Sequence, residues 1–324
     1  MRGRSTRSAY TSGVPTKILL DCDPGHDDAI AILLAAGNPD IDLLAVTTAA
    51  GNQTLQKVTR NALAVASIAG LTGVPVAAGC DRPLVRAPET AAQTHGESGL
   101  DGPELPAPTQ GPDPRHAIDV IIETVRAHGP GEITLVATGA LTNLALAVRK
   151  APDIAPRVRE VVLMGGGMSG GNWTPAAEFN ILIDPEAAHI VFTAGWQVVM
   201  VGLDATHQAL ATPEVVARIA ALGTVPARFV EELLEFFGRS YLETQGFPHP
   251  PVHDPVAVAR VIDAAAVPVE RIPIAIELTG THTLGMTVAD RRRPAPDDCR
   301  TFAATGLDHA RFWDLVVDAL ERLG

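Results

Sequence analysis

The chain has 324 residues, of which 46% are apolar and 19% are charged, and its formal net charge is −12. A chain of this length can bury a large core, as one big α/β domain or as two ordinary ones. The acidic balance argues against a nucleic-acid-binding surface, because such surfaces need clustered Lys and Arg to contact phosphates. A small neutral or cationic ligand, or a metal ion, suits this charge better.

The three cysteines, Cys22, Cys80 and Cys299, are an odd number without CxxC spacing, so they indicate neither a disulfide framework nor a zinc site. Residues 1–14 are basic and polar, and no apolar stretch typical of a secretory signal follows them. No segment approaches the roughly 18 apolar residues of a membrane span. We therefore expect a disordered tail over residues 1–14, no membrane association and a cytoplasmic protein.

Short apolar runs alternate with amphipathic segments along most of the chain. The runs predicted as strands are 17–21, 41–47, 74–78, 132–137, 160–164, 197–201 and 272–277. Their continuous apolar character is typical of strands buried on both faces of a parallel sheet. The amphipathic segments predicted as helices between them are 28–36, 54–69, 116–128, 141–150 and 185–193.

After residue 203 the pattern becomes mainly helical, with helices predicted over 213–222, 227–243, 255–262 and 308–323. The Gly- and Pro-rich stretches at 79–114 and 165–175 are long for loops in a compact domain, and such loops are often functional. Repeated βα alternation predicts an open, mostly parallel, doubly wound α/β sheet with helices on both faces. An additional helical segment follows at about residue 204. No linker divides the chain, so residues 15–324 are predicted to form a single domain.

The segment DCDPGHDDA at residues 21–29 carries the most concentrated chemistry. A predicted strand ends there, a Pro-Gly turn follows, and a helix begins near Asp27. We expect four carboxylates at the carboxyl edge of the sheet, where α/β folds bind ligands: Asp21, Asp23, Asp27 and Asp28. A helix N-cap explains one aspartate, but four within eight residues repel one another unless a cation or raised pKa values compensate. Oxygen ligands without cysteine suit a hard cation, Ca²⁺ or Mg²⁺.

A second acidic position is Asp254, in the sequence VHDP. An aspartate before a proline at the start of an apolar helix is typical of an N-cap. The same pattern occurs at Asp184, which precedes Pro185. On the local pattern alone Asp254 fits a cap better than a ligand, and the neighbouring His253 adds only modestly to a functional interpretation.

A third polar cluster follows the apolar run that ends at Met164. The three glycines at 165–167 let the backbone approach a ligand closely. Asn172, Glu178 and Asn180 then supply donors and acceptors that can hydrogen-bond vicinal hydroxyls. Gly-Asn pairs are equally common in ordinary turns, and no phosphate-binding glycine pattern is present.

Three other polar positions lie near the same edge or in a long loop. Thr138 and Asn52 each follow a predicted strand, so both are expected at the carboxyl edge of the sheet. His95 lies in the first long loop, where by itself it fits a surface position better than a catalytic one.

Together these segments resemble the inosine-uridine preferring nucleoside hydrolases, from about Lys17 to the C-terminus. The shared segments, in the order of the family, are DCDPGHDDA, HGESG, VVLMGGG, EFNILIDPEAA and VHDP. The resemblance implies hydrolysis of the N-glycosidic bond of purine and pyrimidine ribonucleosides, of the inosine/uridine type, to free base and ribose. It also implies a homo-oligomer, either a tetramer or a dimer.

The resemblance implies four calcium ligands: Asp23, Asp28, the main-chain carbonyl of Thr138, and Asp254. It implies that Asp23 activates the attacking water and that His253 protonates the leaving base. The positions that it implies for contact with the ribose are Asp27, Asn52, Asn172, Glu178 and Asn180, and Met164 lines the same pocket. The positions that it implies around the base are His95 and Tyr241. Phe237 departs from the tyrosine of some related enzymes, and Trp173 stands where smaller residues occur, on the 5′ side of the ribose.

Two other interpretations stay open. An aspartyl phosphatase also begins with a strand and Asp-x-Asp, but it expects a small hydroxyl residue soon afterwards, where this chain has Pro24-Gly25-His26. A calcium-dependent nucleoside- or sugar-binding protein without turnover would keep the same pocket, since fold does not imply function. The complete set of implied ligands and catalytic residues favours an enzyme.

Overall fold

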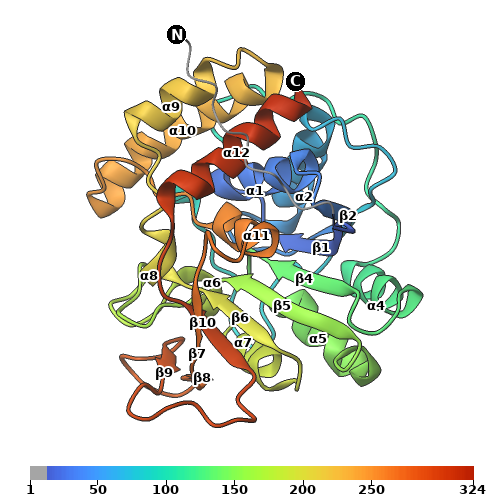
Figure 1. The fold of residues 1–324 in the computed structure, drawn as a ribbon, viewed down its shortest axis with the longest axis vertical. Helices are drawn as coiled ribbons and strands as arrows, with labels where there is room; N and C mark the ends of the chain where they lie inside the picture. Colours follow the sequence, from blue (N-terminus) through green and yellow to red (C-terminus); the bar gives the residue numbers. More distant parts are fainter. Residues whose placement is uncertain (1–12) are drawn as a thin grey trace.

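A computed structural model describes residues 13–324 (Figure 1). Its centre is an eight-stranded sheet with strand order β3-β2-β1-β4-β5-β6-β10-β7. Neighbouring strands are parallel, except that β7 runs antiparallel to β10 at one edge. The prediction of an open, mostly parallel α/β sheet is therefore confirmed. The tail expected over residues 1–14 lies outside the described residues, apart from residues 13 and 14.

The strands of the central sheet are β1 (Thr16–Cys22), β2 (Ile41–Thr48), β3 (Val76–Ala78), β4 (Ile133–Ala137), β5 (Val158–Met164), β6 (Val198–Val201), β7 (Val269–Arg271) and β10 (Thr301–Ala304). A separate antiparallel pair consists of β8 (Ile274–Ile276) and β9 (Thr287–Ala289). The prediction that 272–277 is a strand of the parallel sheet was therefore wrong. The strand that pairs with β6 at this edge of the sheet is β10. Its short run TFAA is too short to predict a strand from the sequence.

The helices are α1 (His26–Gly37), α2 (Leu55–Ile68), α3 (Ala92–His95), α4 (Ala117–Ala127), α5 (Thr142–Lys150), η1 (Pro152–Ile154), α6 (Phe179–Ile183), α7 (Pro185–Thr193), α8 (Leu203–Thr206), α9 (Pro213–Ala220), α10 (Val225–Gln245), α11 (Asp254–Ile262) and α12 (His309–Leu323). The longer ones occupy the predicted segments. The short helices α3, α6 and α8 were not predicted, and each contributes residues near the site described below.

The sheet separates two apolar layers, and the side chains of β1 alternate between them. Ile18 and Leu20 belong to the layer that includes α1, α11 and α12, whereas Leu19 belongs to the layer of α4, α5 and α7 (Figure 1). The helices α9 and α10 pack beside each other and against α12. Within residues 13–324, no helix is both long enough and apolar enough to cross a membrane.

The segment that forms α1 was predicted to be amphipathic. The helix is instead enclosed on all sides. Every residue of α1 except Ala36 is buried, because the sheet lies on one side and α11 and α12 pack on the other. This packing fixes the N-terminus of α1, with its aspartates, directly after the carboxyl end of β1.

Candidate active site

A pocket of about 440 Å³ opens at the carboxyl edge of the central sheet, near the ends of β1, β2, β4 and β5. All eight positions that the resemblance assigns to the substrate line it: Asp27, Asn52, His95, Met164, Asn172, Glu178, Asn180 and Tyr241. His253, Thr138 and Asp254 line it too. Asp23 and Asp28 lie behind its wall and are completely buried. The structure thus brings together residues from distant parts of the chain.

Asp23 follows β1 and turns its carboxylate into a narrow space between two loops. Its Oδ2 accepts the main-chain N–H of Asn52 at 2.6 Å. Its Oδ1 is buried and has no hydrogen-bond partner within residues 13–324. Gly51, after β2, and Gly139, after β4, flank the carboxylate so closely that a Cβ at either position would overlap it. These glycines make room for Asp23, whose Oδ1 can bind a proton or a cation.

Asp28 lies in the first turn of α1 with both carboxylate oxygens hydrogen-bonded. Its Oδ2 accepts the main-chain N–H of Gly25 and the side-chain amide N–H of Asn52, both at 3.0 Å. Its Oδ1 accepts the hydroxyl of Thr138 at 2.8 Å. Asp28 therefore ties α1 to the loops that follow β2 and β4.

Asp254 does not cap its helix, although the local pattern favoured that interpretation. The helix α11 begins at Asp254 itself, and its N-cap residue, His253, makes no side-chain capping bond. In the matching pattern at α7, the carboxylate of Asp184 accepts the main-chain N–H of Ala187 at 3.0 Å. Tertiary packing, not the local pattern, separates these two aspartates.

Asp254 joins Asp27 and Asp28 in an acidic cluster, in which one carboxylate oxygen of each lies within 4.8 Å of the others. Burial raises the pKa of Asp27 to about 7, and the neighbouring carboxylate of Asp28 adds to this effect. Burial, followed by the charges of nearby aspartates, raises the pKa values of Asp23 and Asp254 well above their ordinary range. A hard cation among these oxygens would offset their repulsion, so the acidic cluster is able to hold a metal ion.

Asp21 is not part of the site, contrary to the expectation of four carboxylates at the sheet edge. Its carboxylate accepts the hydroxyl of Thr47 at 2.5 Å and the side-chain amide N–H of Asn143 at 2.8 Å. It lies within β1, with its side chain on the same face as Leu19, because strand residues two apart share a face. Asp21 therefore fastens the sheet to α5.

Glu178 and Asn180 form a polar part of the pocket wall at the start of α6. Glu178 accepts the main-chain N–H groups of Gly166 and Asn180 at 2.9 Å and of Ile181 at 3.1 Å. Burial raises the pKa of Glu178 to about 7. Asn180 donates its side-chain amide to the main-chain carbonyl of Thr138 at 2.9 Å. This wall is therefore rigidly hydrogen-bonded before any ligand enters.

The two long loops predicted to be functional meet beside the pocket. In the second, Asn172 accepts the main-chain N–H of Phe179 at 3.0 Å. The neighbouring Trp173 donates its indole N–H to Glu89 of the first loop at 2.8 Å. The Trp173 ring also packs against Phe179, with ring centroids 4.7 Å apart. Asn172 and Trp173 are thus held in place as part of the wall.

His253 makes side-chain contacts through both ring nitrogens. Its Nδ1 lies 2.8 Å from the hydroxyl of Thr206, and its Nε2 lies 2.7 Å from the hydroxyl of Tyr241. Its main-chain N–H donates to Asp27 at 3.1 Å. Burial, with a smaller contribution from His207, lowers the pKa of His253 to about 3. Burial therefore favours the neutral imidazole of His253 over the imidazolium.

Thr206 and His26 lie at the site although no role was predicted for either from the sequence. Thr206 stands 47 residues before His253, and no local pattern connects the two. His26 is completely buried, and its Nδ1 lies 3.2 Å from Nδ1 of His95. Its position inside the aspartate motif was the one available signal. His95 itself is buried in the wall, not on the surface as its loop position suggested.

Comparison with known proteins agrees with this geometry. The family model described as inosine-uridine preferring nucleoside hydrolase matches residues 18–314. A curated protein of that name from Crithidia fasciculata is 59% identical over 312 residues, which are 96% of this chain and 99% of the relative. The pyrimidine-specific ribonucleoside hydrolase RihA of Shewanella sp. (strain ANA-3) is 44% identical over 94% of this chain and 95% of its own length. The solved purine-preferring ribonucleoside hydrolase from Gardnerella vaginalis superposes with a TM-score of 0.89 and 32% identity, covering 95% of this chain and 98% of that one.

The α/β sheet with an acidic pocket at its carboxyl edge is the architecture of a nucleoside hydrolase. The chain belongs to the inosine-uridine preferring nucleoside hydrolase family. It is an enzyme that hydrolyses the N-glycosidic bond of ribonucleosides. The phosphatase interpretation and the interpretation as a binding protein without turnover are therefore both set aside.

Proposed function

We propose that one calcium ion is held by Asp23, Asp28, Asp254 and the main-chain carbonyl of Thr138. The buried Oδ1 of Asp23, which lacks a partner within the described residues, supports this assignment. All four groups offer oxygen atoms, which calcium prefers. The Thr138 carbonyl accepts one hydrogen bond, from Asn180, and keeps a second lone pair. When bound, the ion would neutralise the carboxylates and polarise oxygen ligands, including ribose hydroxyls and water.

Asp27 is assigned to the ribose rather than to the ion, although it belongs to the acidic cluster. One of its oxygens accepts the main-chain N–H of His253, which orients the carboxylate along the pocket wall. Three amides and a second carboxylate that line the same pocket are also assigned to bind the ribose. They are Asn52, Asn172, Asn180 and Glu178. The side chains of Asn172, Glu178 and Asn180 are fixed by hydrogen bonds to main-chain groups, and that of Asn52 is fixed by the carboxylate of Asp28, so all four can hold vicinal hydroxyls without first reorganising.

Asp23 is the general base in this proposal. With Oδ1 assigned to the ion, Oδ2 is the atom that accepts the proton of the attacking water, because it accepts only the main-chain N–H of Asn52 and keeps a second lone pair. The water oxygen bonds to C1′ of the ribose as the bond from C1′ to the base nitrogen breaks. Positive charge builds on the sugar in such a reaction, and the surrounding carboxylates stabilise it.

The leaving base receives its proton from the side of the pocket that holds Tyr241 and His253. His253 is neutral and therefore has no imidazolium proton to give. Burial raises the pKa of Tyr241 well above its usual value, so its hydroxyl keeps its proton and can donate it in a hydrogen bond. We assign protonation to the Tyr241–His253 pair: the hydroxyl proton of Tyr241 passes to the base nitrogen as the bond from C1′ breaks, and solvent returns a proton to the pair when the products leave, while Asp23 releases to solvent the proton taken from the attacking water. Thr206 holds the second ring nitrogen of His253. This modifies the role in which His253 alone is the acid.

The base preference, assembly and location are also proposals. Identity of 59% to an inosine-uridine preferring relative supports hydrolysis of both purine and pyrimidine ribonucleosides, with His95 and Tyr241 beside the base. We propose that residues 15–324 act as one domain in a homotetramer or homodimer. Nucleic acid and membranes are not proposed as partners. The three cysteines are unpaired, which supports a reducing, cytoplasmic location.

The unpartnered buried Oδ1 of Asp23 is the single observation that carries this proposal. The test is to incubate the purified protein, in calcium, with inosine and with uridine, and to measure released ribose as reducing sugar. The wild type is expected to release ribose from both. Asp23→Asn is expected to retain less than about a hundredth of the rate on either, because its amide cannot accept the proton. Full activity of Asp23→Asn would contradict the assigned base.

A further inference from the structure

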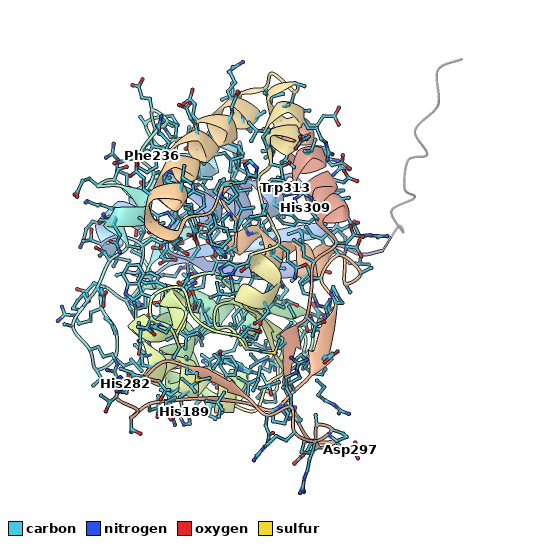
Figure 2. The ribbon with its side chains drawn as sticks, turned by 90° about the vertical axis from the view of Figure 1, so that its left-hand side faces the viewer. His189, Phe236, His282, Asp297, His309 and Trp313 are labelled. Carbon is cyan, nitrogen blue, oxygen red and sulfur yellow. The ribbon has the colours of Figure 1, made fainter. Side chains whose placement is uncertain are left out.

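His26 lies in a stack of rings behind the pocket wall. Its ring centroid is 5.1 Å from those of Phe236 and Phe237, and 5.4 Å from that of His95. Figure 2 labels Phe236 on α10, the helix that supplies both phenyl rings. No hydrogen bond connects the ring of His26 to a carboxylate within residues 13–324. The ring therefore has no anionic hydrogen-bond partner that would favour an imidazolium.

The proton of the neutral His26 ring has a defined position. Nε2 lies 2.8 Å from the main-chain carbonyl oxygen of Asp101. A carbonyl oxygen only accepts hydrogen bonds, so Nε2 is the protonated nitrogen of His26. The other nitrogen, Nδ1, therefore carries a lone pair, and this lone pair faces Nδ1 of His95 at 3.2 Å.

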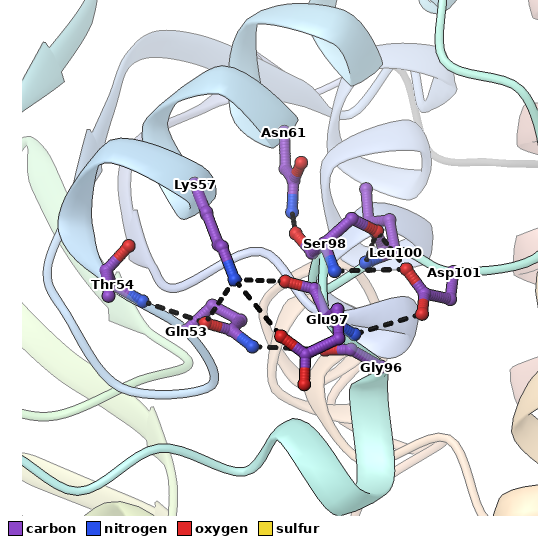
Figure 3. A network of polar contacts seen from close by, with 9 residues as sticks. All are labelled: Gln53, Thr54, Lys57, Asn61, Gly96, Glu97, Ser98, Leu100 and Asp101. Atoms are coloured by element: carbon purple, nitrogen blue, oxygen red, sulfur yellow. Dashed lines mark hydrogen bonds and ion pairs between the residues drawn. The ribbon is translucent and has the colours of Figure 1, made fainter.

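The carbonyl of Asp101 is held in place by a network around residues 96–101 (Figure 3). The carboxylate of Asp101 accepts the main-chain N–H groups of Glu97 at 2.9 Å and of Ser98 at 3.0 Å. Asn61 donates its amide to the main-chain carbonyls of Ser98 at 2.9 Å and of Pro24 at 3.1 Å. Because Pro24 lies two residues before His26, this network fixes the acceptor relative to the ring that donates to it.

His95 therefore has a partner for its Nδ1 in either neutral form. When Nδ1 carries the proton, it can donate to Nδ1 of His26. When Nδ1 carries a lone pair, it can accept the main-chain N–H of His26 at 3.2 Å. The other nitrogen of His95, Nε2, has no hydrogen-bond partner among the described residues, and His95 lines the pocket.

We propose that His26 is a specificity-determining residue, because it lets His95 present either a proton or a lone pair at Nε2 to the nucleobase. This inference rests on the proposed placement of the base beside His95. Hypoxanthine and uracil each carry ring N–H donors and carbonyl acceptors, but at different places on their edges. A wall group that can both donate and accept pairs with whichever group a base places opposite Nε2, whereas a group limited to donation pairs only with bases that place an acceptor there.

His26→Phe tests the proposal while keeping a ring in the stack. The variant removes the Nδ1 lone pair but leaves the main-chain N–H, so His95 is held with its proton on Nε2. The values of kcat/KM for inosine, adenosine, uridine and cytidine should then fall unequally, by about 10- to 100-fold for bases that need an acceptor. Bases that need a donor should fall by much less. Equal losses for all four nucleosides would show that His26 is only structural, and would overturn the proposal.

Phe236→Leu is the matched control. It disturbs the stack on His26 from the side of α10 but touches none of the hydrogen bonds to His95. It is expected to leave the ratios among the four nucleosides within about twofold of the wild type. His26→Gln supplies a second variant with an amide oxygen and an amide N–H. It should recover part of the kcat/KM that His26→Phe loses for the affected nucleosides. A change in the ratios for Phe236→Leu as large as that for His26→Phe would contradict the assignment.

The side-chain ¹⁵N shifts of His95, measured by NMR with hypoxanthine or uracil as the probe, test the proposal without turnover. In the wild type the proton of His95 should shift between Nδ1 and Nε2 according to the base added, and in His26→Phe it should stay on Nε2. One unchanging form in the wild type with both bases, or a charged His26 ring, would overturn the proposal. A wild type that hydrolysed no ribonucleoside would refute the proposed function instead, and the NMR comparison would still decide the role of His26.

Discussion

The hydroxyl of Tyr241 lies 2.7 Å from Nε2 of His253, so an aromatic residue of α10 directly contacts the residue before α11. The contact is buried, since Tyr241 is 3% exposed and His253 is 4% exposed. Removing the Tyr241 hydroxyl therefore leaves Nε2 of His253 without its hydrogen-bond partner in a buried site, while Nδ1 keeps its contact with Thr206.

Tyr241→Phe removes this hydroxyl and keeps the ring. We expect kcat for inosine to fall by about 10²- to 10⁴-fold, because the leaving base loses its proton source. A ribosyl substrate whose leaving group needs no proton, such as nitrophenyl riboside, should lose less than about tenfold. Steady-state kinetics with both substrates at saturating calcium make the comparison. Equal losses on both substrates would remove Tyr241 from the acid role.

Asp184 and Asp254 share a local sequence pattern but should respond differently to removal of the carboxylate. Asp184→Ala should lower the free energy of unfolding by about 1–3 kcal/mol, because it deletes the cap of α7 and a bond to Thr142. Asp254→Ala should lower it much less in the absence of calcium, since it removes one of several repelling buried carboxylates. Urea unfolding in chelator measures both. A larger loss for Asp254→Ala would contradict the distinction.

The glycines beside Asp23 give a steric prediction. Gly139→Ala places a Cβ against the carboxylate of Asp23, so it should displace that group and lower kcat by about 10²-fold or more. Gly111→Ala is the control, because a Cβ there meets no atom within 4 Å and should leave kcat unchanged. Wild-type kcat in Gly139→Ala would show that the position of Asp23 tolerates movement.

The sugar should be recognised through its 2′-hydroxyl. In the proposed site Asp27 and the calcium ion would both contact this group, so its absence would leave buried polar groups unpaired. Discrimination by such a site reaches about 10⁴-fold. We expect kcat/KM for inosine to exceed that for 2′-deoxyinosine by a factor of this order. Similar kcat/KM values for the two substrates would contradict the assignment of Asp27 to the ribose.

Much of the fold follows from continuous apolar runs, and β1, β2, β4 and β5 appear where these runs predict them. β10 does not, because its four residues become a strand only by pairing with β6 and β7, which lie far away in sequence. The run at 272–277 shows the converse, since its apolar character was correct but its partner is β9. The local pattern therefore predicts which residues form a strand better than it predicts which strands pair.

The site shows the same division. The motif at 21–29 predicts a concentration of carboxylates. It does not show that β1 continues past Asp21, which places this side chain on the same face of the sheet as Leu19 and outside the site. The position of Asp254 beside Asp27 and Asp28 and the contact of Thr206 with His253 arise from packing between distant segments, so the local pattern contains no signal for them. The family resemblance implied a place at the site for Asp254 and gave no role to Thr206.

Calcium binding tests the central claim most directly. Isothermal titration of calcium into chelator-treated wild-type protein should show one site per chain. The same titration into Asp254→Asn should show affinity at least about 10-fold weaker, because one charged oxygen ligand is lost. Asp184→Asn, changed at the matching pattern outside the acidic cluster, should bind like the wild type. No saturable binding to the wild type, or equal affinity of Asp254→Asn and wild type, would contradict the account of this site.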